Sequence, residues 1–232
     1  MYFPWVGLLE QIRLADVFVH YDDVQFSKGG FSNRVQIKTH KGVAWMTIPL
    51  RGVRLGQSIS EVRLDDTRDW RGQHQDLLYQ AYFDAPFRDE MLGLVSRVHE
   101  RSATSLADVA RASTVELATY FDLDRSTVFV DVENLGVSGV GSQRVHDVVA
   151  ALGGDRYVTG HGAKNYLDHA IFEQSSIAVE YMNYGCISYP QLHGPFTPYV
   201  SALDLVANCG KAGLSVICST GLSWELFMKR RK

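Results

Sequence analysis

Three short apolar runs in the second half of the chain alternate with segments of helical periodicity: TVFVD (127–131), RYVTG (156–160) and IAVEY (177–181). The segments between them, 142–152 and 165–175, carry apolar residues at helical spacing. Strands that alternate with helices favour right-handed crossovers between parallel neighbours. The stretch 127–181 therefore predicts an α/β fold with a mostly parallel central sheet.

The first half of the chain predicts a hairpin region followed by helices. A strand is expected at 16–21, a β-hairpin follows it because two alternating runs flank Gly42, and a short third strand is expected at 60–64. The expected hairpin arms are 34–39 and 44–49. Three segments with apolar residues at helical spacing then predict a helical insertion at about 66–121, namely 70–82, 87–100 and 105–121. No repeat or linker divides the 232 residues, so we expect a single domain.

Composition and charge favour a soluble protein. The chain is 46% hydrophobic and 21% charged, which is ordinary for a globular domain. Its net charge of −3 gives no field that attracts a nucleic-acid backbone. The three cysteines form no close pair and no metal-ligand spacing, and no stretch approaches the roughly 18 apolar residues of a membrane helix. We expect a cytoplasmic protein with reduced thiols that binds neither nucleic acid nor membrane, and we expect no metal site.

Polar side chains are unusually dense between residues 22 and 50. Acidic residues follow the strand at 16–21, and the carboxyl ends of parallel strands face the crevice where open α/β sheets bind ligands. Arg34 and Lys38 share one face of the expected hairpin arm and suit a phosphate or carboxylate. The alternative is a solvated face whose cations pair with the acids, worth about 0–1 kcal/mol a pair. The candidates are Asp22 and Asp23 as catalytic residues and Gln25, Asn33, Arg34 and Lys38 as substrate-binding residues.

A turn with the sequence FPWVG (3–7) opens the first expected helix. A proline-containing turn before a helix leaves free backbone N–H groups at the positive end of the helix dipole, which suits an anion. A hydrophobic staple that fixes the entry angle of the helix explains the same residues. Pro4 is the substrate-binding candidate of this turn.

The segment TGHGAKNY (159–166) joins an expected strand to an expected helix. A glycine-flanked loop in that position can cradle phosphate, although the spacing is neither that of a P-loop nor that of a dinucleotide fingerprint. The alternative is that the glycines provide only a tight turn between the strand and the helix. The candidates are His161 as a catalytic residue and Gly160, Gly162, Lys164 and Tyr166 as substrate-binding residues.

The last candidate segments are YPQLHGPF (189–196) and SALDL (201–205). Gln191 and His193 lie on an expected rigid loop, and loops carry binding residues disproportionately often. Asp204 falls in the first turn of an expected helix, where it can bind a ligand or simply match the helix dipole. A thiol nucleophile at Cys186, with His161 or His193 as base, is a less favoured alternative because no local signature supports it.

In these four blocks and their order, from residue 2 to about 210, the chain resembles the WbqC-like protein family. The matching residues outside the 22–50 block are FPWVG, then Thr159, Gly160, Gly162, Tyr166 and Leu167, then Tyr189, Gln191, Phe196, Ser201, Asp204 and Leu205. The family recurs in bacterial surface-polysaccharide and secondary-metabolite gene sets, and its entry turn is reminiscent of nucleotidylyltransferase-like Rossmannoid folds.

The resemblance implies a ligase or transferase that forms or transfers an acyl or amide group onto an amino sugar or related amine. The small-molecule substrate would be anionic or nucleotide-linked, and the cofactor is open between ATP and an activated acyl donor. In this scheme Arg34 and Lys38 hold the anionic group, Asp22 or Asp23 binds the amine or a metal or acts as general base, and the Gly160–Gly162 loop seats a second anion. The alternative is a non-catalytic protein of the same pathway that binds a nucleotide-sugar or acts as a scaffold.

Overall fold

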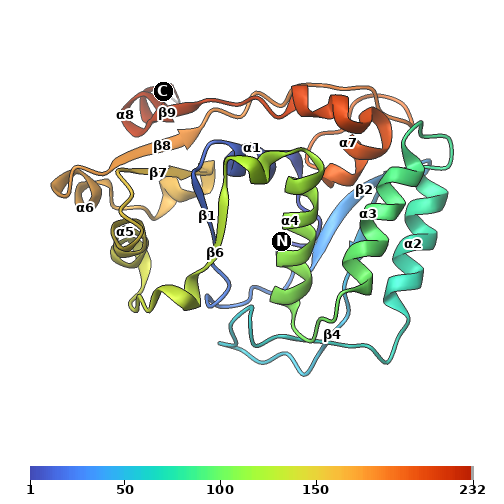
Figure 1. The fold of residues 1–232 in the computed structure, drawn as a ribbon, viewed down its shortest axis with the longest axis horizontal. Coiled ribbons are helices and arrows are strands. Elements are labelled where there is room, and N and C mark those ends of the chain that lie inside the picture. The colour runs from blue at the N-terminus through green and yellow to red at the C-terminus, as the bar shows by residue number, and fades with distance from the viewer. Residues whose placement is uncertain (231–232) are drawn as a thin grey trace.

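The computed structural model describes residues 1–230 and has an α/β architecture (Figure 1). The helices are α1 (Val6–Arg13), α2 (Trp70–Ala81), α3 (Arg88–Glu100), α4 (Leu106–Tyr120), α5 (Gly141–Ala151), α6 (His169–Gln174), α7 (Ala202–Cys209) and α8 (Trp224–Lys229). The strands are β1 (Val17–His20), β2 (Arg34–Thr39), β3 (Gly42–Thr47), β4 (Leu50–Arg51), β5 (Arg63–Leu64), β6 (Val128–Asp131), β7 (Arg156–Thr159), β8 (Ala178–Met182) and β9 (Gly221–Ser223). Short 3-10 helices are η1 (Leu123–Arg125), η2 (Val132–Leu135), η3 (His161–Asn165) and η4 (Gly210–Val216).

The strands form four small sheets instead of the single central sheet that the sequence predicted. β1 pairs with β6 in parallel, β2 with β3 and β4 with β5 in antiparallel fashion, and β7 pairs with β8 in parallel and β8 with β9 in antiparallel fashion. The strand–helix alternation did predict parallel pairs, but β7 does not continue the β1–β6 pair. The last residue of β7, Thr159, leads into Gly160, which lies against the side chain of Gln11 on α1.

The helical middle of the chain agrees closely with its periodicity. Helices α2, α3 and α4 begin and end within one residue of the predicted limits. Asp69 caps α2 by accepting a hydrogen bond from the Gly72 amide at 3.0 Å, and Ser105 and Asp108 form a capping box on α4. The predicted helix at 165–175 is shorter, because residues 161–165 form η3 and Asp168 caps α6.

Two separate hydrophobic cores divide the molecule into two lobes (Figure 1). The large lobe holds α1 to β6 together with α7 and η4, and its core includes Leu9, Trp70 and Leu203. The small lobe holds α5 to β8 together with β9 and α8, and its core includes Phe172 and Tyr181. Within residues 1–230, no helix has both the length and the apolar character that a bilayer crossing requires.

Candidate functional site

Strand β1 lies between two pockets, one beside α4 and one beside α5, and the candidate acids lie near them. Side chains alternate between the two faces of a strand. His20 and Asp22 are directed to α4, where Asp22 pairs with Arg111. Tyr21 and Asp23 are directed to α5, where both contact Arg144. The carboxylates of Asp22 and Asp23 therefore point to opposite sides of the chain where it leaves β1.

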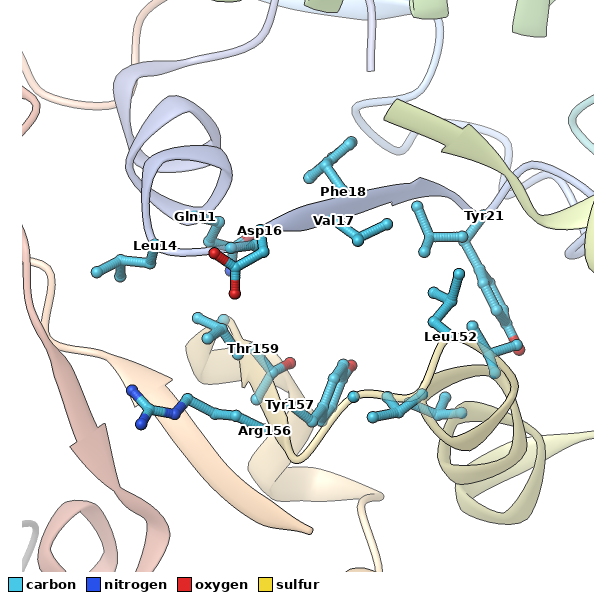
Figure 2. A pocket seen from close by; sticks show the side chains of 18 of the residues that line it. Gln11, Leu14, Asp16, Val17, Phe18, Tyr21, Leu152, Arg156, Tyr157 and Thr159 are labelled. Atoms are coloured by element: carbon cyan, nitrogen blue, oxygen red, sulfur yellow. The ribbon is translucent and has the colours of Figure 1, made fainter. Parts of the chain in front are cut away.

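A cleft separates β1 from β7, and we call it the β1–β7 cleft (Figure 2). Its volume is about 690 Å³. Gln11 and Asp16 lie toward the end near Arg156 and Thr159, whereas Tyr21 lies toward Leu152 at the other end. Val17, Val19, Val145, Val148 and Val149 contribute apolar side chains to the lining, and polar groups contribute nearly as much of it.

Two free strand edges line this cleft. Among the described strands, β1 pairs only with β6 and β7 pairs only with β8, so one edge of each carries no strand partner. Unpaired backbone N–H and C=O groups on such edges can bond a ligand. Three tyrosine side chains, Tyr21, Tyr157 and Tyr166, also line the cleft, and Tyr166 is 63% exposed.

Asp23 joins the two lobes beside the cleft. The Arg144 guanidinium donates to Asp23, with Nη1 at 2.9 Å from Oδ1 and Nη2 in contact with Oδ2. Nη2 also donates to the Val137 carbonyl at 3.1 Å, and the guanidinium lies 5.0 Å from the centre of the Tyr21 ring. The bond to Asp23 is the main reason that the pKa of Arg144 is raised. Both oxygens of the Asp23 carboxylate are thus engaged by protein.

Asp22 belongs to a cluster in which three carboxylates surround Arg111. Its Oδ2 accepts from Arg111 Nε at 2.7 Å, and the same guanidinium contacts Asp131 at 2.8 Å and Glu133 at 3.4 Å. Asp131 ends β6 directly opposite His20 in the parallel register. This cluster therefore lies at the carboxyl ends of two neighbouring parallel strands, as the sequence predicted for Asp22.

Sequence reasoning missed His20, which lines a pocket between β6 and α4. The side chain is buried, and burial lowers its pKa although Asp22 and Asp131 act in the opposite direction. A signal was present, since His20 stands two residues before Asp22 and so shares its face of the strand.

The 159–166 loop reaches the β1–β7 cleft through two of its candidates, Gly160 and Tyr166. His161 is turned into the small lobe, where its Nε2 is 2.6 Å from the Met182 carbonyl oxygen and its ring packs on Phe227. Gly162 is exposed with open space beside it, and Lys164 is half-buried.

Lys38, Gln191 and Asp204 meet in a buried network that we call the Lys38 network. Lys38 Nζ donates to Gln191 Oε1 at 3.1 Å, to the Gly194 carbonyl at 3.1 Å and to the Pro195 carbonyl at 2.6 Å. Tyr82 donates to Asp204 Oδ2 at 3.0 Å, and burial raises the pKa of Asp204. All three ammonium protons of Lys38 are thereby matched with acceptors.

Arg34, Asn33 and Gln25 lie around the start of the hairpin, outside the β1–β7 cleft. Arg34 donates to the Gly30 carbonyl at 3.2 Å, and its guanidinium lies 4.1 Å from the centre of the Trp45 ring. Asn33 is buried and donates to the Ile48 carbonyl at 3.0 Å, whereas Gln25 is exposed. The structure therefore does not bring Arg34 or Lys38 to the cleft that Gly160 lines.

The turn before α1 is clamped to α7. The Pro4 carbonyl accepts from the Ala202 amide at 2.8 Å, and Ser201 Oγ donates to the Phe3 carbonyl at 2.8 Å. A Cβ added to Gly7 would lie 2.3 Å from the Trp5 ring, so the glycine permits the indole to lie over the helix start. His193 Nε2 is 2.6 Å from the Ala81 carbonyl oxygen and ties its loop to the end of α2.

Comparisons with known proteins agree with the motif blocks. The profile of the WbqC-like protein family matches residues 1–216. "Uncharacterized protein Rv1507c" of Mycobacterium tuberculosis (strain ATCC 25618 / H37Rv) is 32% identical over 212 residues, which is 90% of this chain and 90% of that protein. No solved structure matches the chain.

Proposed function

Because the chain belongs to the WbqC-like protein family, we propose that it is an enzyme of bacterial polysaccharide or secondary-metabolite biosynthesis. In this proposal the enzyme forms or transfers an acyl or amide group onto an amino sugar or related amine, and its nucleotide-linked or otherwise anionic substrate binds in the β1–β7 cleft. Family membership supports the assignment to this pathway, and the cleft supports the proposed position of the binding site.

The cleft is the observation that carries the proposal. Its volume of about 690 Å³ falls within the roughly 300–1,000 Å³ of small-molecule sites, which are mostly apolar with a few convergent polar groups. Tyrosine rings can stack on the C–H face of a sugar or on a base, and free strand edges can bond hydroxyl groups. Gly160 also borders the cleft, and the side-chain amide of Gln11 occupies the space beside it and can bond a ligand.

Charged residues suited to a substrate of mixed charge lie at the end of the cleft near Gln11. Asp16 is exposed there and offers a carboxylate to an amine. Arg156, 59% exposed, offers a guanidinium to a phosphate or carboxylate, since Glu180 contacts it only at 3.3 Å. In this proposal the two residues take the roles that the sequence predicted for Asp22 or Asp23 and for Arg34 with Lys38.

One observation favours the alternative of a non-catalytic nucleotide-sugar-binding protein. Both carboxylate oxygens of Asp23 are bonded to Arg144, so this candidate base is already engaged. A binding protein needs only the cleft. An enzyme that joins two substrates needs room for both, so the number of ligands bound together distinguishes the two functions.

The test is a thermal-shift screen of the full chain with UDP-N-acetylglucosamine, ATP and acetyl-coenzyme A, singly and in pairs. A ligand that binds only the folded state raises the melting temperature, and the rise grows with the ratio of ligand concentration to Kd. We expect a response to one nucleotide ligand and an additional response to a second that binds at the same time. A response to one ligand only would favour the binding protein.

A matched pair of tyrosine variants locates the response. Tyr166→Ala removes an exposed ring from the cleft, and Tyr79→Ala removes a 45% exposed ring from α2. The proposal expects the ligand-induced shift to be lost in Tyr166→Ala and kept in Tyr79→Ala. Equal shifts in both variants would contradict binding in the β1–β7 cleft.

A further inference from the structure

A second hollow, which we call the His20 pocket, lies between β6 and α4. Its volume is about 610 Å³, and Phe129, Asp131, Arg101, Arg111 and Asp108 line it together with His20. It occupies the opposite side of β1 from the β1–β7 cleft and opens at the carboxyl ends of β1 and β6. The proposed function above makes no use of it.

His20 is a buried polar side chain without a hydrogen-bond partner. It is 8% exposed and lies between the aromatic rings of Phe18 and Phe129, whose centres are 5.5 and 5.7 Å from that of the imidazole. No other residue within 1–230 makes a hydrogen bond to either ring nitrogen. Its ring nitrogens are not among the fully buried, unbonded side-chain atoms of the described residues, which are Arg13 Nε, His99 Nδ1 and Asp204 Oδ1. They therefore keep surface that is open to the pocket that His20 lines.

The charges around His20 call for a cation. Asp22, Asp131 and Glu133 all contact Arg111, and the buried amino group of Met1 also acts on Asp22 and His20. Three carboxylates therefore face two basic groups. The Asp131 side chain is 35% exposed, and its bond to Arg111 uses only Oδ2. Oδ1 has no partner among the residues that the structure describes. An acceptor oxygen and an unpaired imidazole thus stand at opposite register positions of two parallel strands.

A metal ion does not suit this arrangement. In the part of the chain that the structure describes, no three His, Cys, Asp or Glu side chains are grouped so that they could hold one. An ammonium group carries three donors on a compact charge and can bond one carboxylate oxygen and one imidazole nitrogen at once. The remaining space of the pocket is enough for the small molecule that carries it.

We propose that the His20 pocket binds the primary ammonium group of a small amine, with Asp131 Oδ1 and one ring nitrogen of His20 as its acceptors. A single proton can then pass from the ammonium to that nitrogen, which leaves a neutral amine and an imidazolium beside Asp22 and Asp131. This amine site is separate from the β1–β7 cleft, so the proposal does not rest on the proposed function.

The experiment follows the histidine ring resonances of the full chain by nuclear magnetic resonance while D-glucosamine is added. The His20 resonance is the one missing from His20→Phe. We expect it to shift and saturate with glucosamine, and not to shift with N-acetyl-D-glucosamine, whose amide carries no charge. Equal shifts with both sugars, or none with glucosamine up to its solubility limit, would overturn the proposal.

Variants of three acids place the amine. Asp131→Asn keeps the shape of the side chain and should raise the Kd for glucosamine at least 10-fold. Asp76→Asn removes an exposed acid of α2 outside both hollows, so it is the control and should leave the Kd unchanged. If Asp131→Asn does not fold, titration calorimetry of His20→Phe with glucosamine replaces it. The proposal then expects no heat of glucosamine binding. Loss of binding in Asp16→Asn, which removes an acid from the β1–β7 cleft, and not in Asp131→Asn would place the amine in the cleft and overturn the proposal.

These outcomes are independent of the test of the proposed function. Failure of the β1–β7 cleft as a nucleotide site would appear as equal thermal shifts in Tyr166→Ala and Tyr79→Ala. Failure of the His20 pocket would appear as an unchanged Kd for glucosamine in Asp131→Asn.

Discussion

Lys38 and His20 are both buried basic side chains of the large lobe, and they differ in how their nitrogen atoms are bonded. Lys38 is 3% exposed and donates to three acceptors within 3.1 Å. His20 is 8% exposed and bonds no described residue. The Lys38 nitrogen is therefore held by the fold, whereas the His20 nitrogens keep surface that is open to the pocket that His20 lines. The difference separates residues that maintain the fold from residues left available for a ligand.

The largest effect is expected at Lys38. Lys38→Met removes an ammonium that bonds Gln191 and two backbone carbonyls and that lies near buried Asp204. Removing one partner from a buried charged network costs about 3–5 kcal/mol. Urea unfolding measures the loss, and Lys41→Met on the exposed hairpin turn is the control, expected within about 0.5 kcal/mol of the wild type. Equal stability of the two variants would show that Lys38 is not structural.

Acid should destabilise the protein through a second buried network. Tyr2 Oη lies 3.1 Å from His74 Nδ1 and 2.8 Å from His99 Nε2, and burial lowers the pKa of each histidine to about 4. Both rings therefore bind protons more readily in the unfolded chain. Their stabilising contribution is present above pH 6.5 and is lost as the pH falls toward 4, by about 3 kcal/mol for each ring.

Urea unfolding at several pH values between 7 and 4 measures this loss. His99→Gln should reduce the dependence to about half, because a glutamine does not titrate whereas His74 still does. His40→Gln, at an exposed histidine, should retain the dependence of the wild type. A His99→Gln protein whose stability falls as steeply as that of the wild type would contradict the account of this network.

Two glycines of the family motifs should respond differently to the same substitution. Gly7→Ala places a Cβ 2.3 Å from the Trp5 ring, which Tyr184 and Tyr199 hold from the other side. Overpacking of this kind costs about 1–3 kcal/mol. Gly162→Ala meets open space and should change the free energy of unfolding by less than about 1 kcal/mol. Similar losses in both variants would contradict the packing described for the α1 turn.

The helices and strand positions could be predicted from the sequence because their signals are local. Apolar spacing and the caps at Asp69 and Ser105 mark α2 and α4. Sheet pairing could not be predicted in the same way. The β1–β7 cleft depends on where β7 approaches α1, which is a contact between residues about 150 positions apart, Gln11 and Gly160.

The candidate site could be predicted only in part, because some of its residues are positioned by contacts between distant segments of the chain. Asp22 follows a strand end, and the sequence shows this directly. Lys38 alternates as a surface residue would, and nothing local indicates that the 191–195 loop covers it. His20 shares a face with Asp22, but its lack of a hydrogen-bond partner is a property of the folded chain alone.

The most direct test of the central comparison is the free energy of unfolding of His20→Phe, measured in urea beside glucosamine binding. Phe18 and Phe129 flank the imidazole, so a phenyl ring in its place keeps the aromatic contacts and has no nitrogen to bond a ligand. We predict that His20→Phe is within about 1.5 kcal/mol of the wild type in stability, while glucosamine binding is lost. A loss of about 2 kcal/mol or more, with glucosamine binding retained, would show that His20 maintains the fold and would contradict the account.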